Sequence, residues 1–155
     1  MFNIVLVNPR IPQNTGSIGR MCFNAGFTLH IIKPTIFDIS NKALKRAGLD
    51  YWAKLEPIIW ENLDEFLAKN LAFQQQFFFA TTKGVKAYFE VKFKEGDYLF
   101  FGSESFGLPL SLMDLNKENM IKIPMKECGR SLNLATSVGI ISYEALRQNF
   151  IYFKA

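Results

Sequence analysis

The chain has 155 residues, of which 49% are hydrophobic and 15% aromatic, with a net charge of +4. This length suits one domain that buries enough apolar surface to fold without disulfide bonds, so we expect a single domain over residues 1–155. Two cysteines make no secreted disulfide framework, the first residues lack the features of a signal peptide, and no apolar run approaches the roughly 20 residues that cross a bilayer. We therefore expect a cytoplasmic protein without a membrane partner, whose mild positive charge permits a polyanionic partner without requiring one.

Short apolar runs alternate along the chain with stretches of helical periodicity. This alternation favours an α/β fold, with a mostly parallel sheet and helices on both of its faces. Ligands of such sheets bind beyond the carboxyl ends of the strands, so the loops after Val7, Ala80, Phe101 and Ile123 are candidate site loops. The predicted strands are Phe2–Val7, Phe27–Ile32, Ile58–Trp60, Phe77–Ala80, Tyr98–Phe101 and Met120–Ile123.

The first predicted helix follows a polar turn. Asn14 is its expected N-cap and Gly26 its expected stop, which places Arg20 in the first or second turn. Its apolar positions at helical spacing are Ile18, Met21, Cys22 and Ala25. Further helical patterns are Lys42–Ala47, Asp64–Lys69 and a long final helix marked by Leu134, Val138, Ile141 and Ala145.

Several common chemistries lack the residues that they need. The one histidine, His30, lies inside an apolar strand pattern, so we expect a packed imidazole rather than a catalytic one. One histidine and two distant cysteines make no zinc site. The run from Gly102 to Gly107 has the glycine spacing of a phosphate-binding loop, but Leu108 and Pro109 stand where that loop needs lysine and a hydroxyl residue.

Three separate segments carry residues from which a site could be built. The first is Asn14–Arg20, whose arginine could face a phosphate or a developing oxyanion. The second is Phe101–Pro109, a glycine-framed loop whose backbone could line a pocket and whose Glu104 could accept hydrogen bonds from backbone donors. Each also has a purely structural interpretation, as a surface arginine on an amphipathic helix and as a tight turn between a strand and a helix.

The third segment joins Ile123–Met125 to Arg130–Gly139. Ser131 and Asn133 lie near the start of the final helix, where they could cap it or hold a ligand. An ordinary cap before a core helix is the structural alternative for this segment.

In this order, the segments resemble the SPOUT superfamily of RNA methyltransferases, in its 2′-O-ribose branch. They match N-x-G-x-x-R, F-G-x-E-x-x-G-[LI]-P, and I-P-M followed by R-S-[LM]-N-L. Shorter runs resemble the small YibK/TrmL-type subgroup of tRNA (cytidine/uridine-2′-O-)-methyltransferases. These runs are Ile11–Gly16, Ala47–Tyr51, Thr81–Gly84 and Tyr143–Ala145.

The chain departs from the pattern of this subgroup in two places. Asn8-Pro9-Arg10 stands where an acidic pair usually surrounds the proline, and the loop Lys126–Gly129 is atypical in detail. Both departures bear on the recognition of tRNA more than on the reaction.

The resemblance implies an α/β domain whose C-terminal part threads a trefoil knot, which general fold rules would not suggest. It also implies S-adenosylmethionine as cofactor, held mainly by backbone groups, and S-adenosylhomocysteine as product. The residues that the resemblance assigns to the cofactor are Ala80, Thr81, Thr82, Gly102, Glu104, Gly107, Ile123, Ser131, Leu132 and Asn133.

The implied reaction is methyl transfer to the ribose 2′-hydroxyl of the wobble nucleotide of leucine tRNAs (cytidine or 5-carboxymethylaminomethyluridine, position 34). A ribose hydroxyl is a poor nucleophile at neutral pH, so a group must accept its proton or stabilise the alkoxide. The resemblance assigns catalysis to Arg20. Because arginine keeps its proton in proteins, we expect it to stabilise the oxyanion or to orient a phosphate. No metal is needed, because the sulfonium already activates the methyl group.

The resemblance further implies a homodimer that completes the catalytic arginine and the tRNA surface across its interface. No DNA partner is expected, and each predicted RNA-contacting lysine could instead be a solvated surface residue. The predicted substrate contacts are Asn14, Lys42, Lys45, Arg46, Lys83 and Tyr143.

Two alternatives stay open. One is a 2′-O-methyltransferase that acts on another tRNA or ribosomal RNA site. The other is a non-catalytic RNA-binding protein on the same fold, against which Arg20, Glu104 and Asn133 argue.

Overall fold

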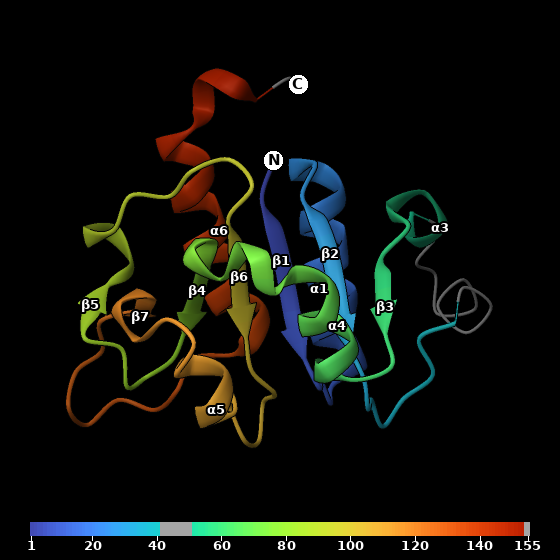
Figure 1. Cartoon of the computed structure of the whole chain (residues 1–155), viewed down its shortest axis with the longest axis horizontal. Helices are drawn as coiled ribbons and strands as arrows, with labels where there is room; N and C mark the ends of the chain where they lie inside the picture. Colours follow the sequence, from blue (N-terminus) through green and yellow to red (C-terminus); the bar gives the residue numbers. More distant parts are fainter. Residues whose placement is uncertain (41–50, 154–155) are drawn as a thin grey trace.

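A computed structural model describes residues 1–40 and 51–153 of the chain (Figure 1). In these residues one sheet has the strand order β3-β2-β1-β6-β4-β7-β5, and every neighbouring pair is parallel, which confirms the predicted α/β class. The six predicted strands are all present, with ends that differ by at most one residue, whereas the short edge strand β5 was not predicted. The strands are β1 (Asn3–Val7), β2 (Thr28–Ile32), β3 (Ile58–Trp60), β4 (Phe77–Ala80), β5 (Lys86–Ala87), β6 (Tyr98–Phe101) and β7 (Met120–Lys122).

Helices cover both faces of the sheet, as predicted. Figure 1 shows α4 and α5 in front of the strands, with α1 and α6 behind them. No helix in the described part of the chain has the length and hydrophobicity that a membrane crossing requires. The predicted helix Lys42–Ala47 lies outside the described residues. The helices are α1 (Pro12–Ala25), α3 (Trp52–Leu55), α4 (Leu63–Asn70), α5 (Leu110–Met113) and α6 (Leu134–Gln148), with 3₁₀ turns η1 (Leu71–Gln76), η2 (Tyr88–Glu90), η3 (Lys117–Asn119) and η4 (Phe150–Tyr152).

Successive side chains of each central strand point to opposite faces of the sheet and pack in two separate hydrophobic cores. Ile4 and Leu6 of β1 pack in the cluster that contains residues of α1 and α6. Val5 and Val7, one position later, pack in the cluster that contains residues of α4 and α5. Because side chains alternate across a strand, a strand that is covered on both faces is apolar at every position, which explains the unbroken apolar runs of the sequence.

Helix α1 begins earlier than the sequence pattern predicts. Ile11 is its N-cap and Pro12 its first residue, so Asn14 is buried inside the first turn and its prediction as the N-cap is wrong. Proline has no N–H to leave unpaired and its φ is already helical, which favours a start at Pro12. Arg20 therefore lies in the third turn, not in the first or second. The predicted stop is confirmed, because Gly26 has the left-handed φ of 68°.

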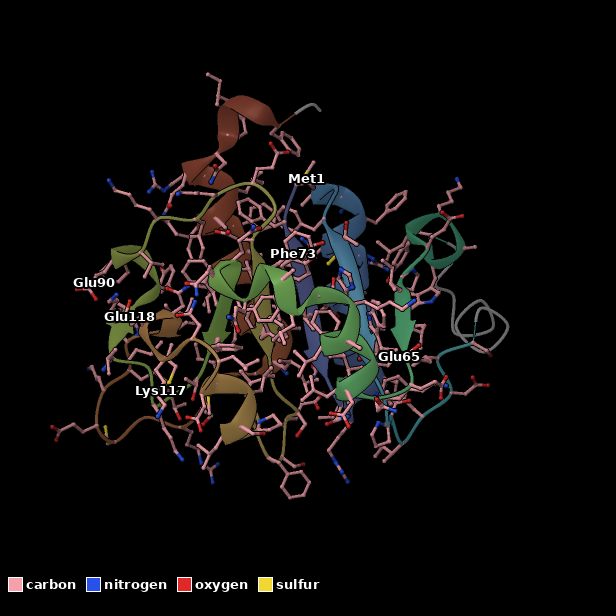
Figure 2. All side chains as sticks on the ribbon, viewed as in Figure 1. Met1, Glu65, Phe73, Glu90, Lys117 and Glu118 are labelled. Atoms are coloured by element: carbon pink, nitrogen blue, oxygen red, sulfur yellow. The ribbon has the colours of Figure 1, made fainter. Side chains whose placement is uncertain are left out.

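His30 is a packed residue in the middle of β2, as predicted. It is 4% exposed, and the indole N–H of Trp60 donates to its Nδ1 at 3.2 Å. The proton of the neutral ring is therefore on Nε2, which donates to Oδ1 of Asn3 at 3.2 Å. Aromatic rings surround it, and Phe73, labelled in Figure 2, stacks on Tyr98 at the outer side of this cluster. Burial lowers the pKa of His30 to about 4.

This environment predicts a loss of stability in acid. A pKa lowered from 6.5 to about 4 means that stability is fully present above 6.5 and falls as the pH drops toward 4, by up to about 3 kcal/mol. Asp97, whose pKa burial raises to about 6, acts in the opposite direction. The difference in unfolding free energy between wild type and His30→Gln, measured from pH 7 to pH 4, isolates the imidazole. Since the chain has one histidine, its NMR titration is unambiguous, and a midpoint near 6.5 would contradict the prediction.

Candidate functional site

A cavity of about 650 Å³ opens at the edge of the sheet where β4, β6 and β7 end. This volume is typical of sites that hold small ligands or cofactors, which span about 300–1,000 Å³. In Figure 1 these strands point toward the lower edge, where the loop after β6 precedes α5. The lining comes from the start of α1, the loops after β4 and β6, and the segment between β7 and α6. The predicted site loops after Ala80, Phe101 and Ile123 therefore meet in one cavity.

The structure brings most of the predicted site residues together. Of the predicted substrate contacts, Asn14 and Lys83 also line the cavity, whereas Lys42, Lys45 and Arg46 lie outside the described residues. All the residues that the resemblance assigns to the cofactor line it: Ala80, Thr81, Thr82, Gly102, Glu104, Gly107, Ile123, Ser131, Leu132 and Asn133.

Arg20 and Tyr143 are placed differently. Neither lines the cavity; Tyr143 is 49% exposed on α6, and Arg20 is exposed on α1. The guanidinium of Arg20 lies 5.6 Å from the ring centroid of Tyr51, and the hydroxyl of Tyr51 donates to the carbonyl of Gly16. The arginine is thus held over an aromatic ring on the surface of its own chain, where it is available to another molecule.

A chain of hydrogen bonds joins the three motifs. The carboxylate of Glu104 accepts from the backbone N–H groups of Arg10 at 2.8 Å and Ile11 at 3.0 Å, and from the side-chain amide of Asn14 at 3.1 Å. The carbonyl oxygen of Asn14 accepts in turn from the amide of Asn133 at 2.9 Å. Glu104 comes from the second motif, Asn14 from the first and Asn133 from the third, so each motif contributes one member.

Asn133 also starts α6, as predicted. Its side-chain oxygen accepts from the backbone N–H of Thr136 at 3.2 Å, which is the N-cap interaction. Its amide nitrogen is then left to donate to Asn14, so one side chain both begins the helix and fixes the wall of the cavity.

Glu104 gives the cavity a fixed negative charge. Burial raises its pKa, but the hydrogen bonds from backbone N–H groups and from Asn14 lower it more, so the pKa lies below its ordinary value of 4.5. Because three donors stabilise the ionised form, Glu104 is charged at neutral pH. The carboxylate also lies at the N-terminus of α1, where the helix dipole favours a negative charge.

Hydrogen bonds within the loop after β6 hold its conformation. The N–H of Phe106 donates to the hydroxyl of Ser103, and the N–H of Gly107 donates to the carbonyl of Ser103, both at 3.0 Å. A Cβ on Gly102 would lie 2.0 Å from the carbonyl carbon of Gly107, and Gly107 itself has a positive φ of 67°. Both positions therefore require glycine, and the loop presents its backbone directly to the cavity.

Some lining residues were not predicted from the sequence. Ile11, Phe106 and Leu110 occupy variable positions of the motifs or lie beside them, where a motif pattern carries no information, whereas Met125 is a fixed residue of the third motif that was given no role. Arg10 contributes its backbone N–H to Glu104, and any residue other than proline could do the same.

Known RNA methyltransferases are similar to this chain in sequence and in fold. Residues 1–143 match the model of the SpoU rRNA Methylase family. A tRNA (cytidine(34)-2′-O)-methyltransferase of Escherichia coli K12 is 47% identical over 150 residues, which covers 96% of this chain and 94% of that relative. A solved structure that concerns the 2-OH methylation of C/U34 on tRNA is 41% identical, with a TM-score of 0.84 and 97% of both chains covered.

A more distant structure shares the fold. The SpoU methyltransferase AviRb of Streptomyces viridochromogenes, solved in complex with the cofactor AdoMet, is 22% identical with a TM-score of 0.81, over 96% of this chain and 60% of that one. The family that was predicted from three short motifs is thus confirmed along most of the sequence. The chain belongs to the SpoU rRNA Methylase family.

Proposed function

We propose that this chain transfers the methyl group of S-adenosylmethionine to the ribose 2′-hydroxyl of nucleotide 34 of a tRNA. The observation that carries the proposal is the convergence of three distant motifs on one cavity through Glu104, Asn14 and Asn133. The match to a tRNA (cytidine(34)-2′-O)-methyltransferase over 96% of the chain supports nucleotide 34 as the target. Leucine tRNAs with a wobble pyrimidine are the proposed substrates, and the cytoplasm is the proposed location.

The cavity fits this cofactor on its own chemistry. Ile123 and Leu132 offer apolar surface for a flat heterocycle, while the hydroxyls of Thr81 and Ser131 and the backbone of the glycine loop offer partners for polar groups. The carboxylate of Glu104 favours a ligand with positive charge. When bound, S-adenosylmethionine supplies a sulfonium-activated methyl group, and the reaction needs no metal.

The residues of the chain divide the remaining work. Glu104, Asn14 and Asn133 hold the cavity walls in place, so little reorganisation is needed when ligands bind. Arg20 stabilises the negative charge that develops on the ribose oxygen, or orients the adjacent phosphate, because its guanidinium cannot give up its proton.

The proposal includes a homodimer. Arg20 lies on the surface and does not line the cavity of its own chain, which supports a site that a second copy completes. It also includes a trefoil knot near the C-terminus. Helix α6 follows β7 in the sequence but packs on α1 and β6, so the chain crosses back behind the sheet.

The direct test is incubation with methyl-labelled S-adenosylmethionine and total tRNA, followed by mapping of the modified ribose. Label on nucleotide 34 supports the proposal. Label on another tRNA nucleotide or in ribosomal RNA would instead support the alternative of a relative with a different RNA target, and no label would favour an RNA-binding role.

Arg20→Ala should keep the affinity for S-adenosylmethionine and lower kcat by about 10²–10³-fold, as expected for the loss of one group that stabilises a developing oxyanion. Single-turnover kinetics and calorimetry separate the two effects, and Arg20→Lys is the control that keeps the charge. A cofactor affinity that falls as much as kcat would make Arg20 a cofactor-binding residue.

Mixing two inactive variants tests the shared site. Arg20→Ala and Asn133→Ala chains, co-expressed with different tags, should regain about one quarter of wild-type activity, since half of randomly assembled dimers are mixed and each has one intact site. If Arg20 acts in its own chain, every site in the mixture carries one lesion and activity stays at the level of the single variants.

Glu104→Gln should destabilise the protein by about 1–3 kcal/mol and weaken binding of S-adenosylmethionine, because an amide cannot accept from three donors as a carboxylate does. The pKa of Glu104 is lowered, so its contribution is present at neutral pH and is lost only as the pH falls below about 4.5. Thermal unfolding and calorimetry measure both effects. Glu118→Gln, at an exposed carboxylate on η3 (Figure 2), is the matched control and should change neither.

A further inference from the structure

Several of the residues that line the cavity are apolar and exposed, and they form its apolar rim. Large hydrophobic side chains usually lie inside a protein, and a cluster of exposed ones marks a surface that binds something. Phe106 stands out, because 80% of it is exposed although the loop that carries it is tied down on both sides. The exposed hydrophobic residues that line the cavity are Ile11 (42%), Phe106 (80%), Leu110 (64%), Met125 (40%) and Leu132 (41%).

A cation accompanies this exposed ring. The guanidinium carbon of Arg10 lies 5.4 Å from the ring centroid of Phe106. The backbone of Arg10 is held by Glu104, two residues before Phe106 in the same loop. The hydrogen bond from Arg10 to Glu104 therefore ties the backbone beside the guanidinium to the loop that carries the ring.

We propose that Phe106 and Arg10 form a stacking site for the unpaired base of the nucleotide whose ribose is methylated. This inference rests on the proposed function, because the ribose must enter the mouth of the cavity while its base stays outside. Bases splayed out of RNA loops stack on aromatic rings and guanidinium planes, and the adjacent guanidinium can also pair with a phosphate.

The chemistry of the pair favours a base over other occupants. A flat ring with a cation beside it suits a planar π-system that carries a negative backbone, whereas an apolar peptide would leave the guanidinium without a partner. Stacking does not read the edge of a base, so this site would accept cytidine and uridine alike.

The test uses an anticodon stem-loop RNA with cytidine at position 34 and a matched RNA in which that nucleotide is abasic but keeps its 2′-hydroxyl. Phe106→Ala should weaken binding of the first RNA by about fivefold or more, as expected for the loss of one base–aromatic stack. Phe106→Trp should restore binding to within about twofold of wild type, and Arg10→Ala should act in the same direction as Phe106→Ala.

The abasic RNA decides between stacking and general disruption. Wild type and Phe106→Ala should bind it equally, because the base that Phe106 contacts is gone. The stacking site would be overturned if wild type and Phe106→Ala bound the cytidine RNA equally, or if Phe106→Ala lost as much affinity for the abasic RNA as for the cytidine RNA. It would also be overturned if Phe106→Ala changed the oligomeric mass of the protein but left its RNA affinity intact. Fluorescence anisotropy measures these RNA affinities without requiring catalysis. Tight, Phe106-dependent binding by a wild-type protein that methylates no tRNA would refute the proposed function and leave the stacking site standing.

Discussion

The hydrogen bonds that run from Glu104 through Asn14 to Asn133 are the constraint on which the site depends. Asn14 is 7% exposed, and a buried amide must find partners for both its donor and its acceptor. Here the donor meets Glu104 and the acceptor meets Asn133. The loss of either neighbour therefore leaves one polar group of Asn14 unpaired, and the loss of Asn14 removes a partner from both of the other motifs. The motifs are far apart in the sequence, and these hydrogen bonds hold them next to one another.

Negative and positive side chains take different places around this hydrogen-bonded site. The carboxylate of Glu104 faces inward with a lowered pKa, while Arg10 and Lys83 lie toward the rim. A negative interior with a positive rim separates recognition of a cationic cofactor from recognition of an anionic RNA, although the net charge of the whole chain is only +4. A mild overall charge is therefore no measure of how strongly one edge of the sheet attracts a polyanion.

The strands could be predicted from the sequence because strands that are covered on both faces leave unbroken apolar runs, as in Phe77–Ala80. Their order could not, since nothing local says that β6 pairs with β1. The cap at Asn133 was predicted correctly, whereas Asn14 was misplaced because Pro12 starts α1 first. Most of the residues that line the cavity could be predicted from the motifs. Phe106 could not, because it occupies a variable position of the second motif.

Under the proposed homodimer, the position of Arg20 would tie catalysis to assembly. The cavity walls are complete within one chain, yet the residue that the family motif assigns to catalysis lies on the outer surface of α1, over Tyr51. Under the proposed homodimer, a monomer would bind the cofactor but leave its methyl group without the group that stabilises the attacking oxygen. Activity would then depend on protein concentration while cofactor affinity would not, because only the catalytic half of the site comes from the second copy. Under the same proposal, such a division would also prevent wasteful methyl transfer to water or small hydroxyl compounds by unassembled chains, since charge stabilisation would appear only where the interface and the RNA meet.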